Sequence, residues 1–222
     1  MPDLNLSSEA VRGEIRDIMA FWLGKGVDGF RLDAVTYYYT GNPDANTEFL
    51  RFLTETGRSI KADCYLVGEA WTDRNEIALL YGSGIDSLFD FPFSNNNGFI
   101  VNIVNGTYAA SDYVKGMLLA QEAYSSANPD YVDAPFYTNH DTARSAGFYS
   151  ADEGPVTKMA YAMSLFMTGN SFVYYGEEIG MKGAGKDENK RLPMYWSDDA
   201  DDPDICAGPP DKDEIPMKFP SA

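Results

Sequence analysis

Three short apolar segments that end at acidic residues recur along this chain at a regular spacing. They run from Val27 to Asp33, from Cys64 to Glu69, and from Ala134 to Asn139, which His140 and Asp141 follow. Asp33 and Glu69 lie 36 positions apart, and Glu69 and Asp141 lie 72 apart, which is twice that step. Because a unit of strand, helix and parallel strand takes roughly 30 or more residues, the spacing predicts one such unit in the first interval and two in the second.

Helical patterns fill the intervals between these segments. Apolar residues repeat at helical spacing from Val11 to Leu23. A helix that begins at Pro155 is expected to bury Val156, Met159, Ala160, Met163 and Phe166. The other predicted elements are helices at Thr47–Ala62 with Asn46 as its cap, at Asn75–Tyr81 and in two pieces within Gly98–Asn128, and strands at Ile85–Asp90 and Ser171–Tyr175. Buried strands that alternate with helices predict an α/β fold, a partial (β/α)8 barrel of parallel strands.

Arg31 and Asp33 stand two positions apart in the first predicted strand. Side chains at positions i and i+2 of a strand point to the same face, so we expect the guanidinium to keep the Asp33 carboxylate ionised. An ionised and oriented carboxylate at a strand end is what the nucleophile of a retaining glycosidase must be.

Glycoside cleavage also needs a carboxyl group that brings a proton to the leaving oxygen. Glu69 follows the apolar run from Tyr65 to Gly68, an environment that favours the acid role. Asp141, beside His140, is expected to bind sugar hydroxyls and to stabilise positive charge on the ring carbon. A single acid at a strand end is more often a helix cap or an ion-pair partner. Three acids at the strand period instead favour one site at the C-terminal strand ends, where barrel enzymes collect their catalytic groups.

The net charge and the residue types argue against several classes of function. The 222 residues carry a formal net charge of −17, which argues against binding nucleic acid or an anionic membrane surface. No apolar run reaches the about 18 residues that a membrane span needs. His140 is the only histidine. A serine or cysteine triad is therefore disfavoured, because the same imidazole would have to act as the base of the triad and also bind sugar hydroxyls. No cluster of cysteine and histidine supports a zinc site.

In combination, these segments resemble the conserved regions of the alpha-amylase family, glycoside hydrolase family 13. Gly29–Val35 resembles the second conserved region, Leu66–Trp71 the third and Phe136–Asp141 the fourth. Further similarities are carried by Met1–Asn5, Tyr174–Gly180 and Lys190–Trp196, the last of which resembles α-glucosidase and neopullulanase-like members.

The resemblance implies a role for each residue of the predicted site. Asp33 stands in the place of the nucleophile and Arg31 in that of its supporting arginine. Glu69 stands in the place of the general acid/base, while His140 and Asp141 stand in those of a substrate binder and the transition-state stabiliser. No cofactor is implied. No metal site carries over either, because Thr36, Tyr37 and Tyr38 follow Val35, where some members have a calcium-binding histidine.

The resemblance also predicts which part of a barrel the chain supplies. The family's first conserved region and the first three barrel strands are absent, so we expect an internal fragment of the catalytic domain that contains strands 4 to 8. Residues 1–6 would be the tail end of a small inserted domain, and residues 176–222 a long loop after the eighth strand. The open edges of such a sheet are expected to promote self-association through Val27–Asp33. Because part of the sugar cleft would be missing, we expect the isolated fragment to be weak or inactive.

The expected activity is hydrolysis, with retention, of α-glucosidic bonds in starch, glycogen or maltooligosaccharides. Ala34, next to the predicted nucleophile, resembles members that act mainly on α-1,4 bonds. Two alternatives stay open. One is a transglycosylase or isomerase of the same family, such as trehalose synthase. The other is a non-catalytic, transporter-associated relative, although such relatives lose the three acids that this chain keeps.

Overall fold

The computed structural model describes residues 3–148, 154–197 and 206–215. Met1 and Pro2 of the predicted N-terminal motif, and parts of the predicted 176–222 loop, lie outside these ranges. The chain divides into two compact units. Unit 1 consists of Met1–Asp90 and Leu118–Ala134, and unit 2 consists of Phe91–Met117 and Pro135–Ala222. Each unit is described by itself.

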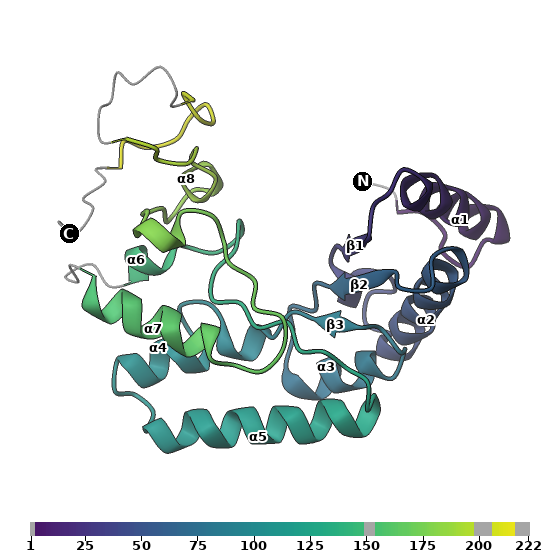
Figure 1. Ribbon diagram of the computed structural model, residues 1–222, viewed down its shortest axis with the longest axis horizontal. Helices are drawn as coiled ribbons and strands as arrows, with labels where there is room; N and C mark the ends of the chain where they lie inside the picture. The colour runs from purple at the N-terminus through teal and green to yellow at the C-terminus, as the bar shows by residue number, and fades with distance from the viewer. Residues whose placement is uncertain (1–2, 149–153, 198–205, 216–222) are drawn as a thin grey trace. The chain divides into compact units, whose positions relative to one another are not determined.

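A parallel sheet forms the centre of unit 1. Strands β1 (Gly29–Leu32), β2 (Tyr65–Gly68) and β3 (Ser87–Leu88) lie side by side in that order, all parallel (Figure 1). A further parallel bridge joins Phe89 to Ala134. The parallel direction of the sheet and the positions of its three strands therefore confirm the sequence prediction.

Helices α1 (Glu9–Gly24), α2 (Pro43–Ile60) and α3 (Arg74–Tyr81) complete most of unit 1. The predicted start of α2 is wrong by four residues. Asn42 is the cap, since its side chain accepts the backbone N–H of Ala45 at 3.1 Å, and Pro43 occupies the first turn. Asn46 is instead buried inside the helix, where it accepts the N–H of Tyr39 at 2.7 Å. Asparagine is a favourable cap at either position, and the contacts of Asn46 with the segment before the helix decide between them.

Unit 1 also encloses two carboxyl groups. Asp90 is fully buried and Asp133 is 6% exposed. Burial raises the pKa of Asp133 to about 7, and burial together with the charge of Asp133 raises the pKa of Asp90 well above its usual range. The hydroxyl of Tyr124 donates to Asp90 at 3.3 Å. The two acids favour a shared proton over two buried negative charges.

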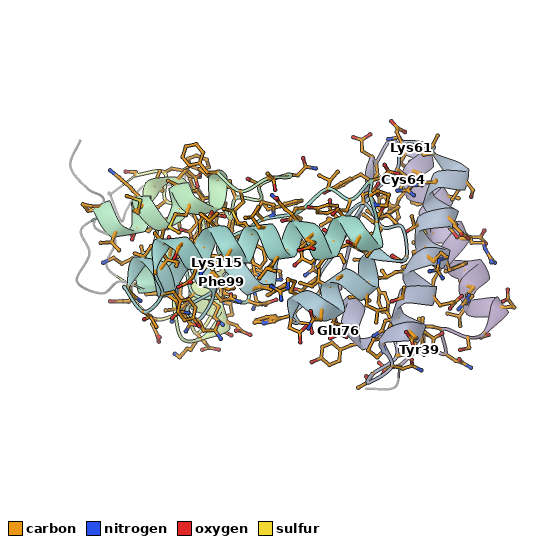
Figure 2. All side chains as sticks on the ribbon, turned by 90° about the horizontal axis from the view of Figure 1, so that it is seen from below. Tyr39, Lys61, Cys64, Glu76, Phe99 and Lys115 are labelled. Carbon is orange, nitrogen blue, oxygen red and sulfur yellow. The ribbon has the colours of Figure 1, made fainter. Side chains whose placement is uncertain are left out.

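Unit 2 is assembled from short helices and loops. Its helices are α4 (Phe99–Val104), α6 (Ser145–Phe148), α7 (Pro155–Leu165) and α8 (Asp187–Lys190), while α5 (Ala110–Ala127) begins in unit 2 and ends in unit 1. Phe99, labelled in Figure 2, stacks on Phe93 with ring centroids 5.1 Å apart. This aromatic pair packs the start of α4 against the short 3₁₀ helix Phe91–Phe93.

The strands predicted at Ala134–Asn139 and Ser171–Tyr175 are reduced to contacts between single residues. Phe136 and Phe172 form a parallel bridge, and the N–H of Phe172 donates to the carbonyl of Pro135 at 2.8 Å. Pro135 has no N–H to offer in return, which limits the ladder here. The parallel direction agrees with the prediction, whereas the length of these strands does not.

Of the face of α7 that was predicted to be buried, Ala160 is buried and Met163 is half-buried, whereas the other three residues are exposed. Met159 is 61% exposed and Phe166, just after the helix, is 87% exposed. The buried side carries Thr157, Ala160 and Ser164 instead. Apolar spacing identified the helix but not its packing side, because the small side chains are the ones that permit close approach to a neighbour. No helix within the described ranges is both long and apolar enough to cross a membrane.

Candidate active site

The end of β1 holds the first part of the predicted site. Arg31 lies in the strand and Asp33 directly after it, and the two side chains form an ion pair through Nη1 and Oδ1. This confirms that they share a face. The Asp33 side chain is 78% exposed and that of Arg31 is 35% exposed. Asp33 is therefore oriented by a cation and open to an incoming molecule.

Glu69 is brought to the same place by the pairing of β1 with β2. Leu32 and Gly68 are paired residues at the ends of the two strands, and the N–H of Glu69 donates to the carbonyl of Leu32 at 2.8 Å. Glu69 Oε1 lies 2.8 Å from Arg31 Nη2, and the Glu69 side chain is 9% exposed. Arg31 thus contacts both carboxylates, whereas the sequence had assigned it to Asp33 alone.

The backbone turns sharply after Asp33. Ala34 has φ 44° and ψ 49°, a left-handed conformation that is uncommon for a residue with a side chain. Glu69 stabilises this turn, because its Oε2 accepts the N–H of Ala34 at 3.2 Å and its carbonyl accepts the N–H of Val35 at 3.0 Å. Strain of this kind persists only where neighbouring groups hold it, and it gathers at functional sites. Nothing in the sequence pattern predicted it.

Tyr38 is a further neighbour of Asp33 that the sequence analysis did not assign. Burial raises the pKa of its phenol, and the negative charge of Asp33 raises it further. The phenol therefore stays neutral across the physiological range and keeps its hydroxyl proton. The sequence signal was weak, because Tyr37, Tyr38 and Tyr39 form a run in which no single ring stands out.

His140 and Asp141 lie together in unit 2. His140 Nε2 is 3.2 Å from Asp141 Oδ2. Two cations that the sequence analysis had left in a loop also reach Asp141. Arg191 Nη2 is 2.6 Å from Asp141 Oδ1, and Lys190 donates to the Asp141 carbonyl at 3.0 Å. The sequence offered a signal for these two residues, because Lys190 and Arg191 begin the Lys190–Trp196 segment that resembles family members.

The predicted site is therefore found as two groups. Arg31, Asp33 and Glu69 contact one another in unit 1, and His140 contacts Asp141 in unit 2. The meeting of both groups around one ligand stays a prediction. Across residues 3–148, 154–197 and 206–215, no three side chains from among His, Cys, Asp and Glu are grouped so as to hold a metal ion.

Replacing Arg191 with glutamine tests the contact with Asp141. Without the guanidinium, the Asp141 side chain loses the ion pair that fixes its Oδ1, while Oδ2 still lies beside His140. We expect the ring signals of His140 to shift in proton NMR at a fixed pH, because the carboxylate that contacts the ring loses its guanidinium partner. The ring signals need no assignment, because the chain has one histidine.

Arg58→Gln is the matched control for this experiment. It breaks an arginine–carboxylate pair in unit 1, with Asp86 at 2.8 Å, whose arginine is 45% exposed against 41% for Arg191. We expect the ring signals of His140 to stay unchanged in this variant. Ring signals that do not move in Arg191→Gln contradict the pairing of Arg191 with Asp141.

Comparison with known proteins connects this geometry to one family. Residues 1–207 match a family model described as "Alpha amylase, catalytic domain". Alpha-amylase 3 of Dictyoglomus thermophilum is 39% identical over 203 residues, which are 90% of this chain and 38% of that protein. Alpha-amylase SusG of Bacteroides thetaiotaomicron is 33% identical over 88% of this chain and 30% of that protein.

A solved structure is similar along nearly the whole chain. Amy13B of Eubacterium rectale superposes with a TM-score of 0.95 at 49% sequence identity, over 99% of this chain and 43% of that one. The chain thus spans less than half the length of the relatives that it matches.

Proposed function

Because the chain belongs to the alpha-amylase family, glycoside hydrolase family 13, we propose that it carries the catalytic residues of a glycosidase that hydrolyses α-glucosidic bonds with retention of configuration. The substrates would be starch, glycogen or maltooligosaccharides, cleaved mainly at α-1,4 bonds. The family's catalytic domain has the TIM-barrel fold. The observation that supports the proposal most is the shared contact of Arg31 with Asp33 and Glu69.

In the proposed reaction an Asp33 oxygen attacks the anomeric carbon. The bond from that carbon to the glycosidic oxygen breaks, and Glu69 gives its proton to that oxygen. Glu69 then takes a proton from water, the water oxygen bonds to the anomeric carbon, and Asp33 is released. The acid role requires the contact of Glu69 with Arg31 to give way to one with the glycosidic oxygen. Asp141 would stabilise the positive charge of the ring, and His140 would bind its hydroxyls.

We further propose where the chain belongs in the barrel. Strands β1 to β3, with the segments bridged at Ala134 and at Phe136 and Phe172, would correspond to strands 4 to 8. Residues 1–6 would then belong to a small inserted domain, and residues 176–222 would follow the eighth strand. This assignment is supported by the parallel direction of every pairing in the described residues.

Product analysis with maltooligosaccharides tests the proposal. Hydrolysis with retention releases products whose new reducing end is first the α-anomer, which proton NMR detects before mutarotation. Longer oligosaccharides or trehalose as main products would instead indicate a transglycosylase or isomerase. No turnover by a longer protein that contains this chain would favour the non-catalytic alternative.

Replacing Glu69 with glutamine tests its role as the acid that protonates the leaving group. The variant lacks the proton for the leaving group, so we expect cleavage of maltotriose to fall by about 100- to 10,000-fold. A substrate with a fluoride leaving group needs little protonation and should still be attacked. Glu55→Gln, on the exposed side of α2, is the control and should keep full activity. Equal losses on both substrates would exclude Glu69 as the acid.

A further inference from the structure

A buried acid outside the proposed catalytic set lies in unit 2. Glu177 begins the short 3₁₀ helix Glu177–Ile179 and is 6% exposed. Its Oε1 accepts the backbone N–H of Ser145 at 3.1 Å and also the hydroxyl of Thr138, while its Oε2 accepts the hydroxyl of Ser145. Three hydrogen bonds therefore converge on one carboxyl group.

These two partners flank the loop that carries His140 and Asp141. Thr138 comes directly before residues 139–144, and Ser145 directly after them. Within the loop, the N–H of Asp141 donates to the Asn139 side chain at 2.9 Å, which is a local turn. Glu177 is thus one group that holds both ends of the loop, from a segment more than 30 residues further along the chain.

The backbone before Glu177 is shaped for this contact. Gly176 has φ 83°, and a Cβ atom at this position would lie 2.3 Å from Sδ of Met181. The carbonyl of Gly176 accepts the N–H of Met181 at 2.9 Å, which closes the turn. Only glycine combines this conformation with such close packing, so the direction of Glu177 follows from the turn.

Burying a carboxyl group at this position costs desolvation free energy, which bears on its function. Burial raises the pKa of Glu177, although its hydrogen bonds and the charge of the fully buried Arg144 oppose that rise. An apolar side chain of similar size would avoid the desolvation cost. Such a side chain has no acceptor atoms and would leave the donors of the loop unfixed, whereas the carboxylate fixes the positions of three donors at once. The geometry therefore favours a role in ordering the loop over a role in stability alone.

We propose that Glu177 is a positioning residue that fixes both ends of the 139–144 loop and thereby sets the directions of the His140 and Asp141 side chains. Its effect on turnover rests on the proposed function, whereas its effect on the loop does not. The two therefore have separate readouts.

Glu177→Gln is the main variant. The amide keeps one acceptor oxygen, but its NH2 group no longer accepts the hydroxyl of Ser145. We expect the ring signals of His140 to shift and broaden in proton NMR. Turnover of maltooligosaccharides should fall about 10-fold in kcat with KM changed less than two-fold, because a small displacement of catalytic groups acts on the transition state. Glu178→Gln, at the exposed neighbour, should change neither readout.

Two further variants keep the test decisive if Glu177→Gln does not fold. Thr138→Val removes the hydrogen bond at the first end of the loop, and Ser145→Ala removes the hydroxyl bond at the second end while the backbone N–H bond remains. Each should shift the His140 signals to a smaller degree. The proposal is overturned if the folded variants keep the His140 signals of the unsubstituted chain. Absence of glucan hydrolysis by a longer protein that contains this chain would contradict the proposed function instead, while the NMR comparison would still decide the role of Glu177.

Discussion

Replacement of Asp33 with alanine is expected to lower α-glucan hydrolysis by at least about 1,000-fold, because the step that forms the covalent intermediate loses its attacking oxygen. The fold should be nearly unaffected. The Asp33 side chain is 78% exposed, and substitutions at such positions change stability by about 0.5 kcal/mol or less. The measurements are initial rates on maltotriose, in a longer protein that contains this chain, and the thermal midpoint by circular dichroism. Asp28→Ala is the matched control, since it removes an exposed aspartate that also pairs with a cation, Lys61.

Covalent trapping identifies the attacking residue directly. A fluorinated glucosyl fluoride forms the ester quickly and releases it slowly, so the labelled protein accumulates. Digestion and mass spectrometry should place the sugar on Asp33, and the Asp33→Ala protein should stay unlabelled. A label on Glu69 or Asp141 would exclude Asp33 as the nucleophile and would reverse the proposed roles.

The second large effect concerns the stability of the fold and its dependence on pH. The pKa of Asp133 is raised to about 7 in the folded chain, against about 3.9 for an unperturbed aspartate. The folded state thus holds a proton that the unfolded state loses, so this contribution to stability is present below about pH 4 and is lost as the pH rises to about 7. We expect the free energy of unfolding to decrease over that window by about 2–4 kcal/mol from this site.

Asp133→Asn should remove the part of that dependence that comes from Asp133, whereas the part that comes from the buried Asp90 remains. Asparagine is neutral at every pH, and its amide N–H can donate to Asp90, so the variant should be the more stable protein at pH 8 and close to the unsubstituted chain at pH 4. Urea unfolding at a series of pH values measures the difference. Asp130→Asn, at an exposed position nearby in the sequence, should leave the curve unchanged. A variant less stable than the unsubstituted chain at pH 8 would contradict the shared proton.

Sequence and structure agree best where an element is determined by its own residues. Helix α3 was predicted within one residue of its start, and Asp73 supplies the cap by accepting the N–H groups of Asn75 and Glu76. The pairing of Arg31 with Asp33 was likewise predicted, since it follows from the alternation of side chains along a strand. The short parallel strands at Ala134–Asn139 and Ser171–Tyr175 were predicted too long, because strand length depends on a partner.

The remaining errors have one physical origin, which is the choice among alternatives that are locally equivalent. Asn42 and Asn46 are both suitable caps, and packing placed the second inside α2. Helix α7 has apolar and small-residue sides, and it buries the small side. In each case the local preferences differ by less than the free energy of the contacts made with neighbouring segments.

The sequence by itself determined the alternation of strands and helices, the parallel sheet and the shared face of Arg31 and Asp33, since periodicity and spacing encode these features. Only the tertiary structure decided that Arg31 also contacts Glu69, that Arg191 reaches Asp141, and that Glu177 holds Thr138 and Ser145. Each of these contacts joins segments more than 30 positions apart. Such contacts depend on how the whole chain packs, which no local pattern records.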